Sequence, residues 1–306
     1  MNPAFSVIFL TTLIGAGQGL FVALFGAELS GFAAPGFLAF GGGVALVLTG
    51  LGLVASFFHL GRPERAWRTA AMWRTSWLSR EVIALPLFMG GLFAWTVAHA
   101  IGAEGTRALG LATLLACAAL WVCTAMIYAS VRFLQEWASA YTLVNYALLG
   151  LASGLTLATA LAAYGAPGIA PSFARWALLA TLAGGVCRGL SLRRNARLKP
   201  KSTLQSAIGI RHPTITQRSM GFMGGSFNTR EFFHGRTPGT LRQVQWWFIA
   251  GAFVLPLALL ALGLRTEAAP LLAAAFVVQY LGLLAERWFF FAQANHPQNL
   301  YYQTVS

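Results

Sequence analysis

Long apolar runs dominate this chain of 306 residues and limit what it can fold into. Eight of them are long enough, and poor enough in charge, to cross a lipid bilayer as helices. They are roughly Phe5 to Ala27, Phe37 to His59, Val82 to Ile101, Leu109 to Val131, Tyr141 to Tyr164, Phe173 to Leu192, Val244 to Leu264 and Ala268 to Phe291. A helix satisfies its own backbone hydrogen bonds inside hydrocarbon. The pattern therefore predicts an all-α integral membrane protein, with residues 1–306 forming a single polytopic bundle of eight transmembrane helices.

Composition supports this fold class and excludes others. The chain is 57% hydrophobic and 9% charged, far from the average of soluble globular proteins. Its 21 Lys and Arg residues outnumber eight acidic residues, but apolar runs separate them and no nucleic-acid recognition motif is present. Cys117, Cys123 and Cys187 fall inside apolar runs and form no CxxC pair. We therefore interpret the cysteines as small core residues and expect no metal site.

Basic residues gather on one side of the predicted membrane. With eight spans, both termini share a side with the connections that follow the second, fourth and sixth helices. That side carries 18 Lys and Arg residues, against three on the other side (Arg107, Arg175 and Arg265). The positive-inside rule places the basic side in the cytoplasm. We expect a multi-pass protein of the bacterial inner membrane with both termini cytoplasmic.

The connection between the sixth and seventh helices is unusually long. From Arg193 to Arg242 the chain is basic and rich in glycine, and its one acidic residue is Glu231. Its four phenylalanines argue against a disordered linker, because disordered segments are poor in aromatic residues. The loop could lie on anionic lipid, or it could dock a soluble subunit with an acidic face, which is the interpretation that we favour. The tail from Ala292 to Ser306 could join the same surface.

The segment between the second and third helices carries the candidate site. Residues Ser56 to Glu81 read SFFHLGRPERAWRTAAMWRTSWLSRE, with five arginines between His59 and Glu81. His and Glu both take up and release protons, and these two lie where the hydrocarbon should begin. Such a pair suits an amphipathic redox carrier such as a quinone, whose reduction consumes protons together with electrons. Each residue alone has a simpler interpretation, since a helix dipole favours Glu in a first turn and His is often a helix cap.

The same segment resembles a known family. HLGRPERAWR followed by RTSWLSREV is similar to the signature of the membrane anchor subunit of dimethyl sulfoxide reductase and related molybdoenzymes, and the eight spans extend the resemblance over nearly the whole chain. The resemblance implies a haem-free, eight-helix protein that exchanges electrons between ubiquinone or menaquinone and an iron–sulfur subunit. That subunit would connect to a molybdopterin catalytic subunit, which makes the complex a heterotrimer.

The resemblance also implies the site residues. The family's catalytic quinone-site residues correspond to His59 and Glu81, with Gly61 and Arg65 as further cofactor-binding candidates. Glu81 would exchange a quinone proton, and His59 would hydrogen-bond or protonate the other ring oxygen. Arg65 could stabilise negative charge on the reduced ring, or it could simply pair with Glu64, and both Arg65 and Gly61 have a structural alternative.

The direction of the reaction follows from finer features of the resemblance. The long basic loop and the ending AERWFFFAQANHPQNLYY are closer to the anchors of sulfite-oxidising molybdoenzymes. With a cytoplasmic basic face, we expect quinone reduction coupled to cytoplasmic sulfite oxidation. The alternative is a menaquinol-oxidising anchor of a dimethyl sulfoxide reductase-type enzyme.

Two functions from other classes remain open. A secondary transporter could hold its substrate at the midplane of eight glycine-rich helices, and a purely structural anchor would have no redox site. Transporters usually keep charges inside their spans, whereas we find little beyond Gln18, His99, Asn145 and Gln279. We also expect no haem, because His99 lies 18 residues beyond Glu81, roughly 27 Å along a helix from the side that carries His59.

Overall fold

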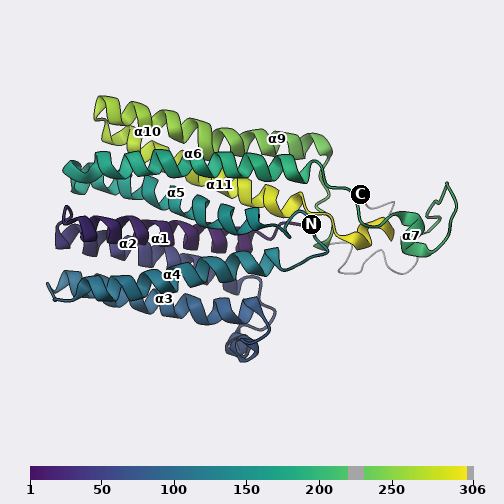
Figure 1. The fold of residues 1–306 in the computed structure, drawn as a ribbon, viewed down its shortest axis with the longest axis horizontal. Helices are drawn as coiled ribbons and strands as arrows, with labels where there is room; N and C mark the ends of the chain where they lie inside the picture. The colour runs from purple at the N-terminus through teal and green to yellow at the C-terminus, as the bar shows by residue number, and fades with distance from the viewer. Residues whose placement is uncertain (220–230, 302–306) are drawn as a thin grey trace.

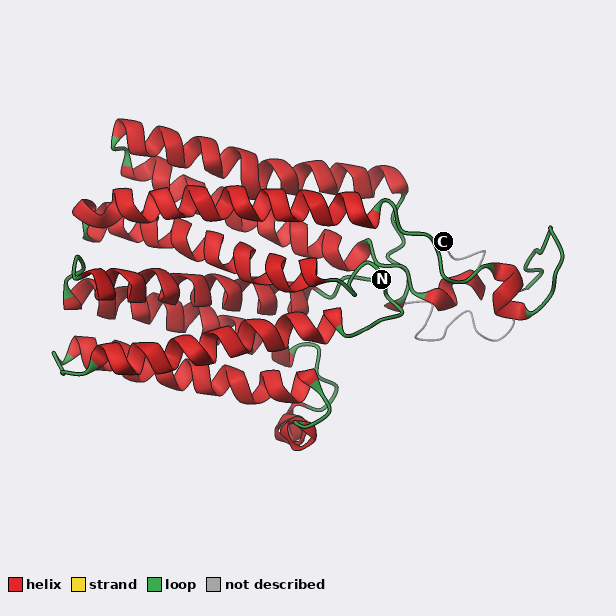
Figure 2. Ribbon diagram, in the orientation of Figure 1, coloured by secondary structure: helices red, strands yellow, loops and turns green. Residues whose placement is uncertain are grey.

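The computed structural model describes residues 1–219 and 231–301. Within these ranges the chain is helical without strands, and eight helical segments are long and apolar enough to span a membrane, which confirms the predicted fold class (Figure 2). The spanning elements are α1 (Phe5–Ser30), α2 (Pro35–Phe57), α3 (Trp77–Ala100), α4 (Thr106–Ala129), α5 (Ala140–Gly165), α6 (Ala170–Asn195), α9 (Pro238–Ile249) with the π-helix η4 (Ala250–Val254) and α10 (Leu255–Thr266), and α11 (Ala269–Ala292). The shorter elements are η1 (Pro63–Met72), η2 (Pro167–Ile169), α7 (Leu204–Ile208) and η5 (Pro297–Tyr301).

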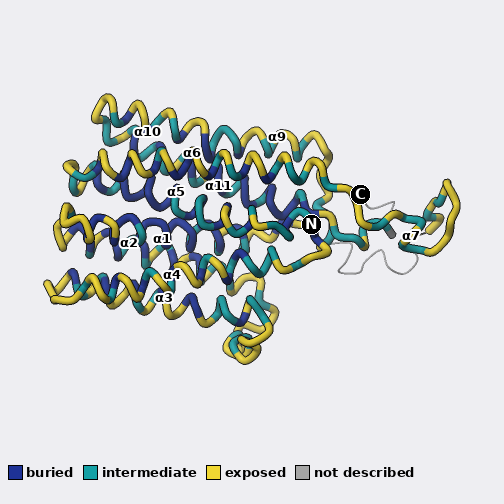
Figure 3. Tube along the Cα trace, viewed as in Figure 1, coloured by how far each residue is buried: buried dark blue, intermediate teal, exposed yellow. Residues whose placement is uncertain are grey.

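The long helices lie side by side along one axis (Figure 1). Helices α1 and α5 lie in the middle and are the most buried spans, while more of the outer helices is exposed, as Figure 3 shows. Many of the exposed residues on the outer helices are large and apolar. Helix α1 packs on α2 and α5, α3 on α4, and α5 on α6. The N-terminus, η1 and α7 lie at one end of the bundle, the right-hand end in Figure 1, which we call the basic end.

Two of the helix boundaries that differ from the expected spans affect the candidate site. Helix α2 ends at Phe57, so His59 lies just beyond the helix instead of closing it. Helix α3 begins at Trp77, because the Ser76 hydroxyl caps it by accepting a hydrogen bond from the Ser79 backbone N–H at 3.4 Å. Glu81 therefore lies inside α3, in its second turn, and not in the connection before it.

Glycines bring the two central helices into backbone contact. A Cβ atom added to Gly154 of α5 would collide with the backbone of Gly19 of α1, and one added to Gly19 would collide with the Gly150 carbonyl. Gly15 and Gly19 of α1, like Gly150 and Gly154 of α5, have the four-residue spacing of small residues that lets membrane helices approach closely. Gly185 and Gly189 of α6 have the same spacing without such a contact, since Gly185 faces the Phe253 ring and Gly189 faces open space.

The long connection, the N-terminus and the C-terminal tail meet at the basic end. The Met1 amino group donates to the Ala294 carbonyl at 2.8 Å, and the Asn2 N–H donates to the Glu231 carbonyl at 2.8 Å. The His296 ring stacks on Phe232 with ring centroids 3.7 Å apart. The tail therefore joins the surface formed by the long connection, as expected. Of the four loop phenylalanines, Phe222 and Phe227 lie outside the described residues.

Candidate functional site

The arginine-rich connection forms an amphipathic helix at the basic end. Helix η1 lies across the direction of the spans and is seen end-on in Figure 2, and none of its residues is buried. Arg62, Arg65, Arg68 and Arg74 are exposed, as are the large apolar side chains of Trp67 and Met72. Arg80 fastens this connection to α3, because its Nε and Nη2 donate to the Trp73 and Arg74 carbonyls, each at 2.8 Å.

His59 lies at the start of this connection. Its side chain is exposed, and partial burial holds the pKa of the imidazole below its usual value. A histidine with a lowered pKa is neutral at pH 7, so it can donate one hydrogen bond and accept another. His59 is therefore suited to hydrogen-bonding a neutral polar group at the membrane boundary.

Glu81 is half-buried between α3 and α4. Its Oε1 atom accepts a hydrogen bond of 2.5 Å from the Thr124 hydroxyl of α4. A carboxyl group in this setting has polar partners in the protein and only partial contact with solvent, which suits proton exchange with a bound molecule.

Gly61 and Arg65 are less closely tied to this geometry. Arg65 Nε lies 3.8 Å from Glu64 Oε1, and both side chains are exposed, so it forms the surface pair that was one of its two expected roles. A Cβ atom added to Gly61 would meet nothing within 4 Å, so packing does not require glycine there. Within the described chain, no direct contact joins His59, Glu81, Gly61 or Arg65 to one another, and their assignment stays a prediction.

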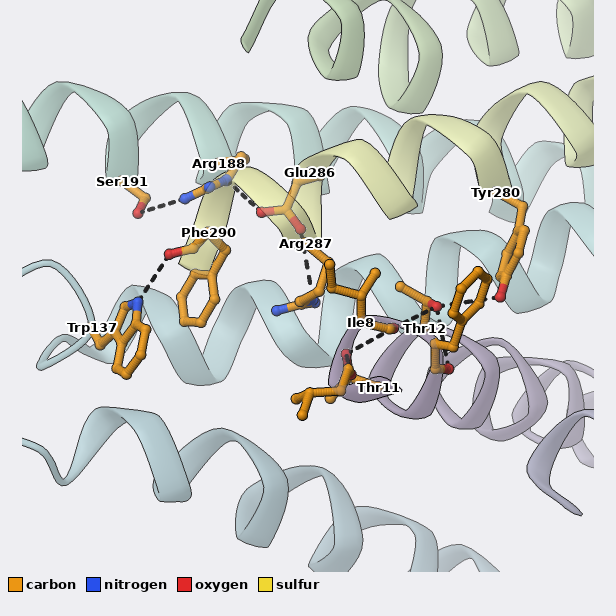
Figure 4. Close-up of polar contacts among 12 residues, drawn as sticks. Ile8, Thr11, Thr12, Trp137, Arg188, Ser191, Tyr280, Glu286, Arg287 and Phe290 are labelled. Carbon is orange, nitrogen blue, oxygen red and sulfur yellow. Dashed lines mark hydrogen bonds and ion pairs between the residues drawn. The ribbon is translucent and has the colours of Figure 1, made fainter. Parts of the chain in front are cut away.

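The sequence reasoning missed a set of buried charges, shown in Figure 4. Arg188 of α6 lies with its Nε atom 2.7 Å from Glu286 Oε1 of α11, and Arg287 Nε lies 3.8 Å from Glu286 Oε2. The three residues are 1%, 1% and 5% exposed. The signal was present, since all three fall inside the expected spans, but we counted the two arginines as part of the basic face. Charges in this position are expensive and commonly functional.

A second buried acid lies at the opposite end of the bundle. Glu28 of α1 accepts hydrogen bonds from Trp95 Nε1 of α3 at 2.8 Å and from the Thr106 hydroxyl of α4 at 2.5 Å. His99 Nε2 lies 3.4 Å from Glu28 Oε1. These contacts tie three helices together at the end remote from Glu81, and they place His99 far from His59.

Metal ligands do not gather in the described part of the chain. Residues 1–219 and 231–301 contain no group of three or more His, Cys, Asp or Glu side chains that could hold a metal ion. The polar groups near Glu81 can exchange protons and form hydrogen bonds, so redox chemistry at this site requires a bound carrier.

Comparisons with known proteins place the whole chain among membrane anchor subunits. The family model described as DMSO reductase anchor subunit (DmsC) matches residues 1–292. A protein of Allochromatium vinosum that is named as the C subunit of sulfite dehydrogenase is 52% identical over the full length of both chains. The anaerobic dimethyl sulfoxide reductase chain YnfH of Escherichia coli strain K12 is 34% identical over 38% of this chain and 41% of its own length.

Proposed function

This chain belongs to the DMSO reductase anchor subunit family, and from that premise we propose that it is the quinone-reactive membrane subunit of an iron–sulfur and molybdopterin oxidoreductase. The observation that carries the proposal is the position of Glu81, a half-buried carboxyl at the basic end of the bundle with a hydrogen bond to Thr124. The substrate chemistry would take place on the partner subunits.

The residues present fit a quinone head group. The two oxygen atoms of an oxidised quinone ring accept hydrogen bonds. In the reduced ring the same oxygens carry protons, which they release when the ring is oxidised. His59 supplies a neutral imidazole and Glu81 supplies an exchangeable proton. The exposed aromatic and basic side chains of η1 are typical of a membrane–water interface, which supports a site at the level where a membrane-soluble carrier presents its head. Bound ubiquinone or menaquinone would supply the two-electron chemistry, and this chain would position the ring and move its protons.

The name of the full-length relative favours sulfite as the source of electrons. We propose that sulfite oxidation on a molybdopterin subunit passes electrons through an iron–sulfur subunit to a quinone held near Glu81. The alternative runs the other way, with menaquinol oxidised here and the electrons used to reduce an external substrate, as the name of the partial relative suggests. Gly61 and Arg65 would border the ring in either direction.

Purification through a tag on this chain tests the composition of the complex. We expect two further subunits, one with iron–sulfur clusters and one with molybdopterin, together with quinone extractable from the detergent-solubilised complex. Sulfite should then reduce added ubiquinone or menaquinone analogue. A chain that purifies alone, without partner subunits or quinone, would contradict the proposal.

The orientation in the membrane is part of the proposal. We place the basic end in the cytoplasm, with both termini, because its arginine excess satisfies the positive-inside rule. The same arginines would also attract an acidic partner subunit on either side of the membrane. The arginine excess therefore has two candidate causes, the topology rule and the binding of a partner.

Cysteine labelling from outside intact cells separates these two causes. Thr216→Cys and Glu267→Cys place exposed cysteines at the two ends of the bundle, while the native cysteines lie within spans. We expect an impermeant reagent to label Glu267→Cys and to leave Thr216→Cys unlabelled. The reverse pattern would place the basic end outside and favour the reductase alternative.

A further inference from the structure

The buried charges at Arg188, Glu286 and Arg287 have no part in the site proposed above, and they do not balance. In the part of the chain that the structure describes, Glu286 is the one carboxylate within ion-pair distance of either arginine, as Figure 4 shows. The cluster therefore holds two positive charges and one negative charge. Arg188 is 1% exposed, and its Nη2 atom has no hydrogen-bond partner among the described residues. Burying an unpaired ion is costly, so the cluster lacks an anion.

Arg188 also lines a groove between two spans. The groove has a volume of about 300 Å³ and lies between α6 and the span formed by α9, η4 and α10. It opens on the outer surface of the bundle, because Leu182 and Val186 in its lining are 55% and 58% exposed. Apart from Arg188, its one polar lining residue is Thr181. The groove is thus an apolar, outward-facing space with a buried charge in its lining.

Two irregular features of the helices shape this groove. A Cβ atom added to Gly189 would meet nothing within 4 Å, so the glycine leaves the groove open beside Arg188. On the opposite wall, Phe253 lies in the π-helix η4. Short π-helical turns within α-helices frequently occur at functional sites. Neither feature is needed for helices that simply pack together, which suggests that the groove holds a ligand.

The groove is charged near the membrane surface and apolar at depth. Arg188 and Phe248 lie towards its basic end, with the guanidinium carbon 5.5 Å from the ring centroid. The next residue, Trp247, is 73% exposed, as is typical of tryptophan at a membrane–water interface. From this level the groove extends roughly 10 to 14 Å deeper, at 1.5 Å per residue, to Thr181 on α6 and Leu257 on α10. This order of charge and apolar surface matches the head and the tail of a membrane lipid.

We propose that this groove binds one anionic phospholipid. The lipid phosphate accepts hydrogen bonds from Arg188 and supplies the negative charge that the buried cluster lacks, while an acyl chain fills the apolar part of the groove. A zwitterionic lipid brings no net negative charge, and a free phosphate ion gains nothing from the apolar walls. The bound lipid thereby joins α6 to the span formed by α9, η4 and α10. This site is independent of the proposed quinone site at His59 and Glu81.

Filling the groove tests the proposal without changing Arg188. Gly189→Leu places an apolar side chain in the groove, where it displaces an acyl chain. Gly90→Leu is the matched control, because Gly90 lies on α3 outside the groove and an added Cβ there also meets nothing within 4 Å. The protein is purified with its partner subunits, delipidated and given phosphatidylglycerol. We expect native mass spectrometry to find one bound phosphatidylglycerol fewer in Gly189→Leu than in the parent or in Gly90→Leu.

Removing the charge tests the choice of lipid. Arg188→Met keeps a long side chain and leaves Glu286 and Arg287 as a balanced pair. We expect the parent to bind phosphatidylglycerol about tenfold or more tightly than phosphatidylcholine, the usual effect of a hydrogen bond to a charged group. Arg188→Met should lose this preference. Phosphatidylglycerol should also raise the unfolding temperature of the parent, whereas inorganic phosphate at the same concentration should not.

Four outcomes would overturn the lipid site. They are equal binding of the two lipids by the parent, an unchanged phosphatidylglycerol count in Gly189→Leu, an equal loss in Gly90→Leu, and stabilisation by inorganic phosphate alone. A preference that persists in Arg188→Met would remove Arg188 from the site. If Arg188→Met does not fold, the comparison of Gly189→Leu with Gly90→Leu still decides whether the groove binds the lipid.

Discussion

Replacement of Glu81 by glutamine is expected to lower quinone-linked turnover by about 10²–10⁴-fold, the usual cost of losing a general acid or base. Glutamine has nearly the size of glutamate, and its amide oxygen can still accept the hydrogen bond from Thr124. It cannot exchange a proton near neutral pH. The expected loss therefore reports on proton exchange and not on packing. Turnover is measured in the purified complex with a soluble quinone analogue.

Glu64→Gln is the matched control for this substitution. Glu64 has the same side chain and lies on the arginine-rich connection that precedes α3, where it is exposed and forms a surface pair with Arg65. We expect its turnover to equal that of the parent and assembly with the partner subunits to be intact in both variants. His59→Ala should also lose quinone-linked turnover. Normal turnover in both Glu81→Gln and His59→Ala would remove these residues from the site.

Replacement of Glu286 by alanine is expected to destabilise the folded chain by about 3–5 kcal/mol, the range for breaking a buried ion pair from one side. The substitution leaves Arg188 and Arg287 buried without their counter-charge. The effect is measured as the unfolding temperature of the detergent-solubilised complex, which is detected by the loss of its partner subunits. Glu104→Ala, in the exposed connection between α3 and α4, should leave the unfolding temperature unchanged.

A double variant shows whether charge is the cause. Arg188→Met with Glu286→Leu removes the close pair and leaves Arg287, whose guanidinium still lies over the Tyr146 ring. Replacing a buried pair by apolar residues is often neutral or stabilising. The double variant should therefore unfold at a higher temperature than Glu286→Ala. If it is no more stable than the single variant, lost packing and not unpaired charge explains the effect.

The fold followed from the sequence because apolar run length is a local property. The eight runs predict eight helices without knowledge of their neighbours, and the described residues form eight helical segments of this kind. The exact ends of the helices were harder to predict from the sequence. The start of α3 depends on the Ser76 cap, and the end of α2 depends on how the connection packs. The position of Glu81 in a helix, and not in a loop, is a consequence of that cap.

The pairing of the buried charges could not be predicted from the sequence, for a different reason. Arg188 and Glu286 are far apart in the chain, and helices that are apolar on most faces show no periodic pattern to indicate which side faces which neighbour. Near the ends of the spans, Arg188 and Arg287 looked like ordinary members of a basic face. Only the folded arrangement, which brings Arg188 of α6 to Glu286 and places Arg287 of α11 over the Tyr146 ring of α5, assigns them to the interior.

The glycine contact between α1 and α5 makes the order of synthesis important. Helix α1 is the first span to be made, yet the partner that covers its glycine face, α5, begins about 110 residues after α1 ends. At ordinary rates of synthesis this is a delay on the order of 5 to 20 s. During that time α1 must remain in the bilayer with its closest-fitting surface against lipid or against the insertion machinery. A nascent chain halted before α5 would keep that surface uncovered, which gives quality-control proteases a simple feature by which to recognise an unfinished anchor.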